Sequence, residues 1–190
     1  MAQTIWLIRH GQTAWTLSGA HTGRTDLPLT EAGRENAIAV GRFLAGRKFA
    51  MVLTSPLQRA RETCRLAGYG DVAQADPNLA EWDYGEYEGR TTSDIRKERP
   101  DWYLWRDGPL NGETVEQVGG RAEKVLTRIA AVDGDVALFA HGHLLRILTA
   151  RWLALPPDCG RMFALNTGTV STLGFERETH VILQWNLPTS

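Results

Sequence analysis

The segment TIWLIRHGQT, residues 4–13, begins as an apolar strand and ends abruptly in polar residues. Residues 5–8 form a continuous apolar run, which is typical of a strand buried on both faces of a parallel sheet. Arg9, His10 and Gly11 follow this run directly. Because ligands of open α/β sheets bind beyond the carboxyl ends of the strands, the segment predicts a ligand site at the end of the first strand.

Two other predicted strands end in polar residues as well. Residues 50–53 are a short apolar run followed by Thr54 and Ser55, and residues 135–140 are followed by the sequence HGH at 141–143. A helix predicted over residues 57–67 carries Arg59 close behind the second strand end. The three strand ends are therefore expected to line a single pocket.

The segments between the strands carry the signals of helices. Thr30 is a predicted N-cap, Ser55 with Pro56 predicts a helix start, and Thr114 with Gln117 forms a predicted capping box. The expected helices cover residues 30–46, 57–67, 114–129 and 144–155, and residues 170–175 and 180–185 are an expected closing pair of strands. This alternation predicts an α/β fold, a three-layer helix–sheet–helix sandwich around a mostly parallel central sheet.

The length of 190 residues predicts a single domain over residues 1–190. Residues 76–112 interrupt the alternation and hold six of the eleven Trp and Tyr residues of the chain. We interpret this segment as a lid-like excursion from the sandwich. The alternative is that its rings pack in an ordinary hydrophobic core.

Composition narrows the classes of function. A formal net charge of −1 does not indicate binding of the whole chain to nucleic acid or to an acidic membrane. No apolar run reaches the roughly 18 residues of a membrane span, and the N-terminus has no signal-peptide pattern, so a cytoplasmic location is expected. The two cysteines, Cys64 and Cys159, show neither a disulfide framework nor metal-ligand spacing.

The expected pocket combines imidazole and guanidinium groups with glycine backbone and with the free amides of a helix N-terminus predicted to start at Ser55 and Pro56. Such a pocket suits an anion. His10 adds a nucleophile, since a neutral imidazole can accept a phosphoryl group. Guanidiniums at Arg9 and Arg59 would keep His10 neutral and would stabilise the charge that develops in the transition state.

Plainer interpretations of these residues stay open at this point. His10, His141 and His143 could supply three nitrogen ligands to a metal ion, although no acidic residue stands at ligand spacing beside them. Arg59 and Arg61 could be solvated charges on a helix.

Six motifs in a fixed order resemble those of one family. They are LIRHGQTAW, TGRTDLPLT, SPLQRARET, LAEWDYGEYEG, NGET and FAHGH, and they run from residue 7 to residue 143. Together they resemble the histidine phosphatase, or phosphoglycerate mutase-like, superfamily over most of the chain. The resemblance implies the phosphoglycerate mutase-like version of the predicted fold and a phosphoryl transfer that uses neither a metal ion nor a cofactor.

The resemblance also implies roles for individual residues. His10 resembles the phosphorylated nucleophile, and Arg9, Arg59 and His141 resemble the remaining residues of the phosphate pocket. Glu81 stands where the family places the carboxyl group that protonates the leaving oxygen, with Asp83 as a weaker candidate. The implied substrate- or phosphate-binding residues are Gln12, Thr22, Gly23, Arg106 and Gly142. Thr16 replaces an Asn that many members have and is a doubtful phosphate ligand.

The predicted activity is hydrolysis of small phosphomonoesters, with sugar phosphates favoured. The chain looks shorter than the enzymes of the mutase branch. This shorter length favours water as the phosphoryl acceptor. Mutase-type transfer and a non-catalytic phosphoester-binding module stay as alternatives. The motifs are most similar to the branch of sedoheptulose-bisphosphatase-like and broad-specificity acid phosphatases, in which Trp102 and Tyr103 would pack on a sugar and Arg106 would pair with a second anionic group. No nucleic-acid or membrane partner is expected, and the oligomeric state is not predicted.

Overall fold

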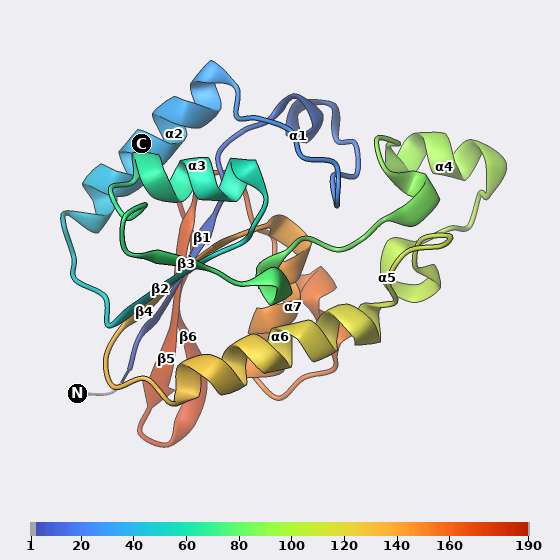
Figure 1. Cartoon of the computed structure of the whole chain (residues 1–190). Coiled ribbons are helices and arrows are strands. Elements are labelled where there is room, and N and C mark those ends of the chain that lie inside the picture. Colours follow the sequence, from blue (N-terminus) through green and yellow to red (C-terminus); the bar gives the residue numbers. More distant parts are fainter. Residues whose placement is uncertain (1–2, 190) are drawn as a thin grey trace.

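The computed structural model describes residues 3–189 and is built around one six-stranded sheet with the order β3-β2-β4-β1-β5-β6 (Figure 1). The strands are β1 (Ile5–Arg9), β2 (Met51–Thr54), β3 (Ala73–Ala75), β4 (Val136–Ala140), β5 (Val170–Glu176) and β6 (Thr179–Leu187). The pairs β3–β2, β2–β4 and β4–β1 are parallel, whereas β1–β5 and β5–β6 are antiparallel. The predicted α/β fold with a mostly parallel sheet is thus confirmed.

Helices cover both faces of this sheet. The helices are α1 (Ala14–Ser18), α2 (Glu31–Leu44), α3 (Gln58–Leu66), α4 (Thr92–Glu98), α5 (Leu104–Asp107), α6 (Val115–Ala130) and α7 (Gly142–Trp152), with short 3-10 turns at Pro77–Leu79, Gly85–Tyr87 and Pro157–Met162. Figure 1 shows α2 and α3 on one face and α6 and α7 on the other. Within residues 3–189, no helix has the length and apolar character needed to cross a membrane.

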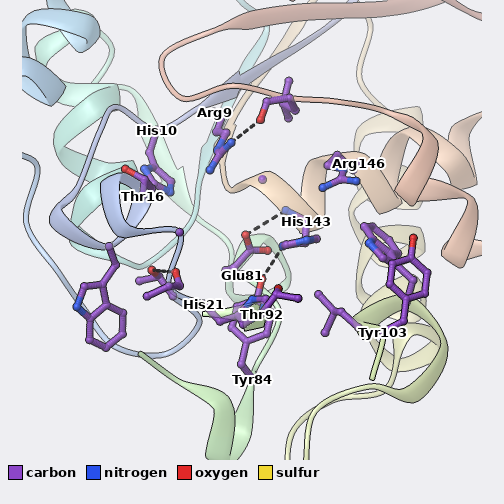
Figure 2. Close-up of a pocket in the computed structure, with 18 of the residues that line it drawn as sticks. Arg9, His10, Thr16, His21, Glu81, Tyr84, Thr92, Tyr103, His143 and Arg146 are labelled. Carbon is purple, nitrogen blue, oxygen red and sulfur yellow. Dashed lines mark hydrogen bonds between the residues drawn. The ribbon is translucent and has the colours of Figure 1, made fainter. Parts of the chain in front are cut away.

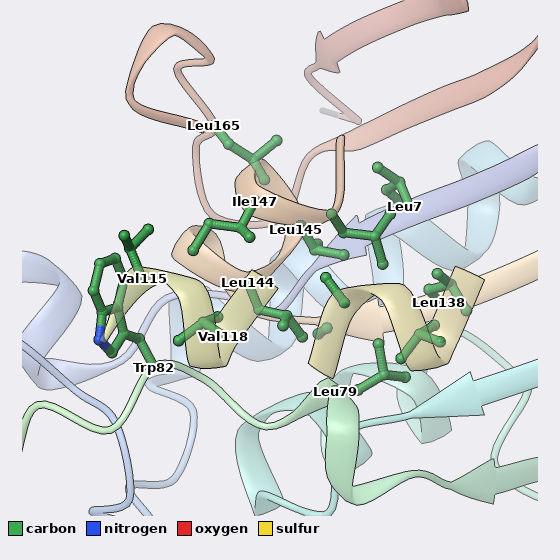
Figure 3. Close-up of a cluster of buried hydrophobic side chains, with 14 of the residues drawn as sticks. Leu7, Leu79, Trp82, Val115, Val118, Leu138, Leu144, Leu145, Ile147 and Leu165 are labelled. Atoms are coloured by element: carbon green, nitrogen blue, oxygen red, sulfur yellow. The ribbon is translucent and has the colours of Figure 1, made fainter. Parts of the chain in front are cut away.

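Strands β1 and β4 lie in the middle of the sheet and are buried from both sides. Leu7 and Leu138 pack with α6 and α7 in one hydrophobic cluster (Figure 3), while Ile8 and Phe139 pack in a second cluster beneath α2 and α3. This explains their unbroken apolar runs, because neither face meets solvent. The register pairs Arg9 with Ala140, so the chain leaves both strands at the same point.

Gly11 lies where the end of β1 meets the start of α2. A Cβ atom on Gly11 would lie 2.2 Å from the carbonyl oxygen of Gly33, and one on Gly33 would lie 2.1 Å from the carbonyl oxygen of Gln12. The N–H of Thr30, the N-cap of α2, donates to that same Gln12 oxygen at 3.0 Å. Gly11 is therefore required by backbone packing.

Several expected elements differ from the structure. The caps at Thr30 and at Thr114 with Gln117 are confirmed. The helix start at Ser55 and Pro56 was wrong: α3 begins at Gln58, and its N-cap Leu57 makes no side-chain capping bond. Helix α7 begins two residues earlier and ends three residues earlier than the expected range of 144–155. The elements β3, α1, α4 and α5 were not expected.

The segment 76–112 carries α4 and α5 and projects beside the sandwich (Figure 1). Most of its rings are buried, with Trp82, Tyr84 and Trp102 at most 2% exposed, and they join the cluster that contains α6 and α7. Tyr103 differs, since 39% of it is exposed. The segment is therefore a packed extension of the core on one side and a wall of the site on the other, and its motion as a lid stays a prediction.

Candidate active site

A cavity of about 360 Å³ opens at the carboxyl ends of β1 and β4 (Figure 2). Its wall is formed by the end of β1, the loop around α1, the start of α7 and the 76–112 segment. The wall residues that matter below are Arg9, His10, Thr16, His21, Thr22, Glu81, Tyr84, Trp102, Tyr103, Trp105, Gly142, His143 and Arg146. The ends of β1 and β4 thus meet in one pocket, whereas the third predicted strand end, at Thr54 and Ser55, contributes no residue to its wall, and neither Arg59 nor His141 is part of the wall.

His10 presents one ring nitrogen to this site. The side chain is 4% exposed, and its Nδ1 lies 2.7 Å from the carbonyl oxygen of Gly11. A carbonyl oxygen only accepts hydrogen bonds, so Nδ1 carries the proton and Nε2 keeps its lone pair. Burial, together with the charges of Arg59 and Arg9, holds the pKa of His10 well below its usual range. The ring is therefore neutral and nucleophilic at neutral pH.

Arg9 is half-buried and follows the apolar part of β1, directly before His10. Its Nη1 donates to the carbonyl oxygen of Leu165, while its Nε is a buried atom without a hydrogen-bond partner among the described residues. A Cβ on Gly142 would lie 3.1 Å from the Cζ of Arg9, so the glycine allows the guanidinium to lie against the start of α7. The free N–H can bind an oxygen of an anionic ligand.

Arg59, on α3, is fully buried and is not part of the cavity wall, although its charge acts on His10. It donates to three backbone carbonyl oxygens of the 22–25 loop, from Nη1 to Thr25 at 2.9 Å and from Nη2 to Thr22 at 3.1 Å and Gly23 at 2.9 Å. Its Nε has no partner among residues 3–189. Thr22 lies on the cavity wall, whereas Gly23 lies behind it and contributes the carbonyl that holds Arg59.

Glu88 holds this loop from the other side and was not anticipated. Its Oε1 accepts the N–H of Gly23 at 2.8 Å, and its Oε2 accepts the hydroxyl of Thr25 at 2.7 Å. A Cβ at Gly23 would come within 2.2 Å of Oε1. Glu88 therefore fixes the carbonyls that orient Arg59, a role that the motif EYEG does not reveal because the partners lie more than sixty residues away.

His141 stands at an angle to His10, with the two ring centroids 5.1 Å apart. It is fully buried, and its Nε2 lies 2.7 Å from the hydroxyl oxygen of Ser55. Its Nδ1 has no partner among the described residues. Burial, then the charge of Arg59, lowers the pKa of His141 well below its usual range.

Glu81 is the carboxylate of the cavity. Its Oε1 accepts N–H groups of Trp82 and Leu144, each at 2.9 Å, and its Oε2 accepts the N–H of His143 at 3.0 Å. Two of these donors belong to the first turn of α7, so the helix start holds the carboxyl group in place. Asp83 lies outside the cavity wall, where it pairs with Arg24 at 2.9 Å.

Three other predicted residues lie away from the ligand space or are already engaged. Gln12 accepts the hydroxyl of Thr30 through Oε1 at 2.9 Å and is not part of the cavity wall. Thr16 lies on the wall, but its hydroxyl donates to the carbonyl oxygen of Thr13. Arg106 is also outside the cavity, since its guanidinium is mostly exposed and pairs with Asp107 at 2.8 Å.

Arg146, unlike Arg106, lines the cavity, as do Arg9 and Arg96. It lies on the wall, donates from Nε to the carbonyl oxygen of Gly160 at 3.0 Å, and stacks over the Trp105 ring at 4.8 Å. Its position four residues after Gly142 places it on the same face of α7, one turn along. That spacing in the sequence HGHLLR was the available signal.

The imidazoles of the site are engaged in hydrogen bonds. Nδ1 of His143 lies 2.6 Å from the hydroxyl of Tyr84, and Nε2 of His141 contacts Ser55. Across residues 3–189, no three or more His, Cys, Asp or Glu side chains are grouped in a way that could hold a metal ion. The donor set of His10, His141 and His143 thus lacks the geometry of a metal centre.

Comparisons with known proteins agree with this geometry. The family model for the histidine phosphatase superfamily (branch 1) matches residues 5–188. The chain is 41% identical over 176 residues to an acid phosphatase of Mycobacterium tuberculosis, covering 90% of this chain and 86% of that protein. It is 38% identical over 182 residues to the sedoheptulose 1,7-bisphosphatase of Saccharomyces cerevisiae, covering 78% of this chain and 67% of that protein.

A solved structure is similar over the whole chain. The Mycobacterium tuberculosis protein of open reading frame Rv3214 superposes with a TM-score of 0.91 at 38% identity, and the match covers 99% of both chains. The family match, the sequence relatives and the superposition agree on the family and the fold. The chain therefore belongs to branch 1 of the histidine phosphatase superfamily and is a phosphomonoesterase with the phosphoglycerate mutase-like fold.

Proposed function

We propose that the protein hydrolyses small phosphomonoesters, sugar phosphates among them, through a phosphohistidine formed on His10. The observation that carries the proposal is the buried neutral imidazole beside two guanidiniums, each of which keeps one N–H group without a protein partner. A phosphoryl group bound there would face the Nε2 lone pair and positive charge together.

In the first step, the Nε2 lone pair of His10 bonds to phosphorus while the ester P–O bond breaks. Arg9, Arg59 and His141 would bind the phosphoryl oxygens, and Glu81 would give its proton to the leaving oxygen. In the second step, the Glu81 carboxylate takes a proton from water as the water oxygen bonds to phosphorus and the P–N bond breaks. Inorganic phosphate leaves, and both side chains return to their starting states.

The part of the cavity beyond the phosphate pocket supports a sugar-sized leaving group. Trp102, Tyr103 and Trp105 form part of its wall, and Tyr103, which is 39% exposed, can offer its ring to a sugar. Arg146 adds a cation there, suited to a second phosphate or to a carboxylate. These features favour sugar phosphates and bisphosphates over esters with small neutral leaving groups.

Replacing the nucleophile tests the phosphohistidine route. We expect His10→Ala to abolish turnover of p-nitrophenyl phosphate and to abolish an acid-labile, alkali-stable phosphate label after rapid quenching, because the accepting nitrogen is gone. Wild-type turnover should be unchanged by a chelator. Persistent labelling of His10→Ala would refute the assignment.

Replacing Glu81 tests proton donation. We expect Glu81→Gln to lower kcat for an alkyl phosphate by about 10²–10⁴-fold and to affect an aryl phosphate far less, because a good leaving group needs no proton. Asp83→Asn is the matched control, since Asp83 lies outside the cavity. Equal losses for both esters in Glu81→Gln, or a similar loss in Asp83→Asn, would contradict the role.

Replacing Arg146 tests the preference for a second anionic group. We expect Arg146→Gln to raise KM for a sugar bisphosphate by roughly tenfold or more, because a charged hydrogen bond is lost, and to change KM for p-nitrophenyl phosphate little. Arg106→Gln should leave both values unchanged, since that guanidinium lies outside the cavity. A wild-type enzyme that turns over no sugar phosphate, or only interconverts phosphoglycerates, would contradict the proposal.

A further inference from the structure

Four histidines belong to this site, and three of them, His10, His141 and His143, each have one ring nitrogen within 2.7 Å of a different protein group. The fourth, His21, lies on the cavity wall with its Nε2 3.4 Å from the hydroxyl of Thr92. A neutral imidazole carries a single proton, so the nitrogen that holds it decides which face donates and which accepts. The partners of His10, His141 and His143 are a carbonyl, a serine hydroxyl and a tyrosine hydroxyl. Counting donors and acceptors therefore fixes the tautomer of each ring.

His10 has the simplest partner. The carbonyl oxygen of Gly11 accepts from Nδ1 at 2.7 Å, which leaves Nε2 unprotonated. This ring contributes a lone pair.

The tautomer of His141 is fixed by Ser55. Here the ring nitrogen that contacts the protein group accepts a hydrogen bond, whereas that of His10 donates one. The Ser55 oxygen accepts the N–H of Leu57 at 3.3 Å, and its own hydrogen has His141 Nε2, at 2.7 Å, as its partner. The reverse arrangement would leave both the hydroxyl hydrogen and Nδ1 without partners in a buried setting. Nε2 of His141 therefore accepts, and the unpartnered Nδ1 carries the proton.

His143 is fixed by Tyr84. Burial raises the pKa of Tyr84 well above its usual range, so the phenol keeps its hydrogen. His143 Nδ1, at 2.6 Å, is the one partner of that hydroxyl among residues 3–189. Because the pKa of His143 is lowered by burial and then by Arg146, the ring is neutral and its proton lies on Nε2. His143 lines the cavity and thus presents an N–H group to it (Figure 2).

We propose that Ser55 and Tyr84 are positioning residues that set the tautomers of His141 and His143. These three rings then supply one lone pair, on His10, and two N–H donors. In the proposed reaction, the His141 donor would bind a transferring phosphoryl oxygen, and the His143 donor, on the cavity wall, would bind the leaving group. Only the use of these donors rests on the proposed function, because the tautomers are defined without any substrate.

Nitrogen-15 spectroscopy of the histidine rings tests the tautomers directly. The protein contains five histidines, each of which can be assigned by single replacement. In the wild type at neutral pH, two-bond proton–nitrogen correlations should show the proton on Nδ1 of His10, on Nδ1 of His141 and on Nε2 of His143. A proton on Nε2 of His141 or on Nδ1 of His143 would overturn the proposal, whatever the activity of the enzyme.

The variants test which residue sets each tautomer. Ser55→Ala should give a mixture of tautomers at His141 alone, Ser55→Thr should restore the wild-type pattern, and Tyr84→Phe should give a mixture at His143 alone. Two buried hydroxyls outside the site serve as controls: Ser171→Ala loses the bond from the N–H of Asn186, and Tyr69→Phe loses the bond to the carbonyl of Arg47. Unchanged spectra in Ser55→Ala and Tyr84→Phe would overturn the assignment.

Kinetics then show whether the donors are used. Ser55→Ala should lower kcat in proportion to the fraction of His141 rings that the spectra show with the proton on Nε2, with little change in KM, because those molecules lack the donor. Tyr84→Phe should affect substrates with hydroxyl-bearing leaving groups more than p-nitrophenyl phosphate. Correct tautomers with unchanged rates would contradict the proposed use of the donors, and an equal loss of kcat in Ser171→Ala would trace the effect to the fold.

Discussion

The burial of a neutral imidazole against two guanidiniums is the constraint on which the rest of the site depends. Like charges that are buried together are costly unless hydrogen bonds satisfy them. Arg59 is satisfied by three carbonyl oxygens of the 22–25 loop, and Arg9 by the carbonyl oxygen of Leu165. That loop is in turn held by the Glu88 carboxylate. The protein thus supports the cations with backbone oxygens and leaves the Nε of each without a partner among residues 3–189.

The carboxyl group of Glu81 connects the aromatic 76–112 segment to the start of α7. Its oxygens accept from Trp82 on its own segment and from His143 and Leu144 on the helix. Helix α7 therefore positions Glu81, His143 and Arg146 relative to one another, while β1 and β4 position His10 and His141. In the proposed function, the residues for the reaction and those for binding the leaving group are thus positioned by the same three elements.

Much of the fold, and the meeting of the β1 and β4 ends in one cavity, could be predicted because the signals are local. The apolar runs of β1 and β4, the Thr30 cap and the capping box at Thr114 each depend on a few adjacent residues. Short elements such as β3 and α1 were not predicted, because neither contains a fully buried residue and so neither shows an apolar pattern in the sequence. Contacts between distant segments could not be predicted, for another reason. The hydrogen bonds between Glu88 and the 22–25 loop and between Ser55 and His141 join residues that come together only once the chain is folded. Whether Arg106 or Arg146 lines the cavity depends on which helix face meets it.

The most direct measurement is a pH titration of the His10 ring, followed by nitrogen-15 chemical shifts in the ligand-free enzyme. Burial and the charges of Arg59 and Arg9 lower the pKa of His10. We therefore expect the ring to remain neutral as the pH falls through 6.5, the usual value for histidine. A ring that takes up its proton at pH 6.5 or above would show that the guanidiniums do not hold it neutral, and would contradict the proposed role of His10 as the nucleophile.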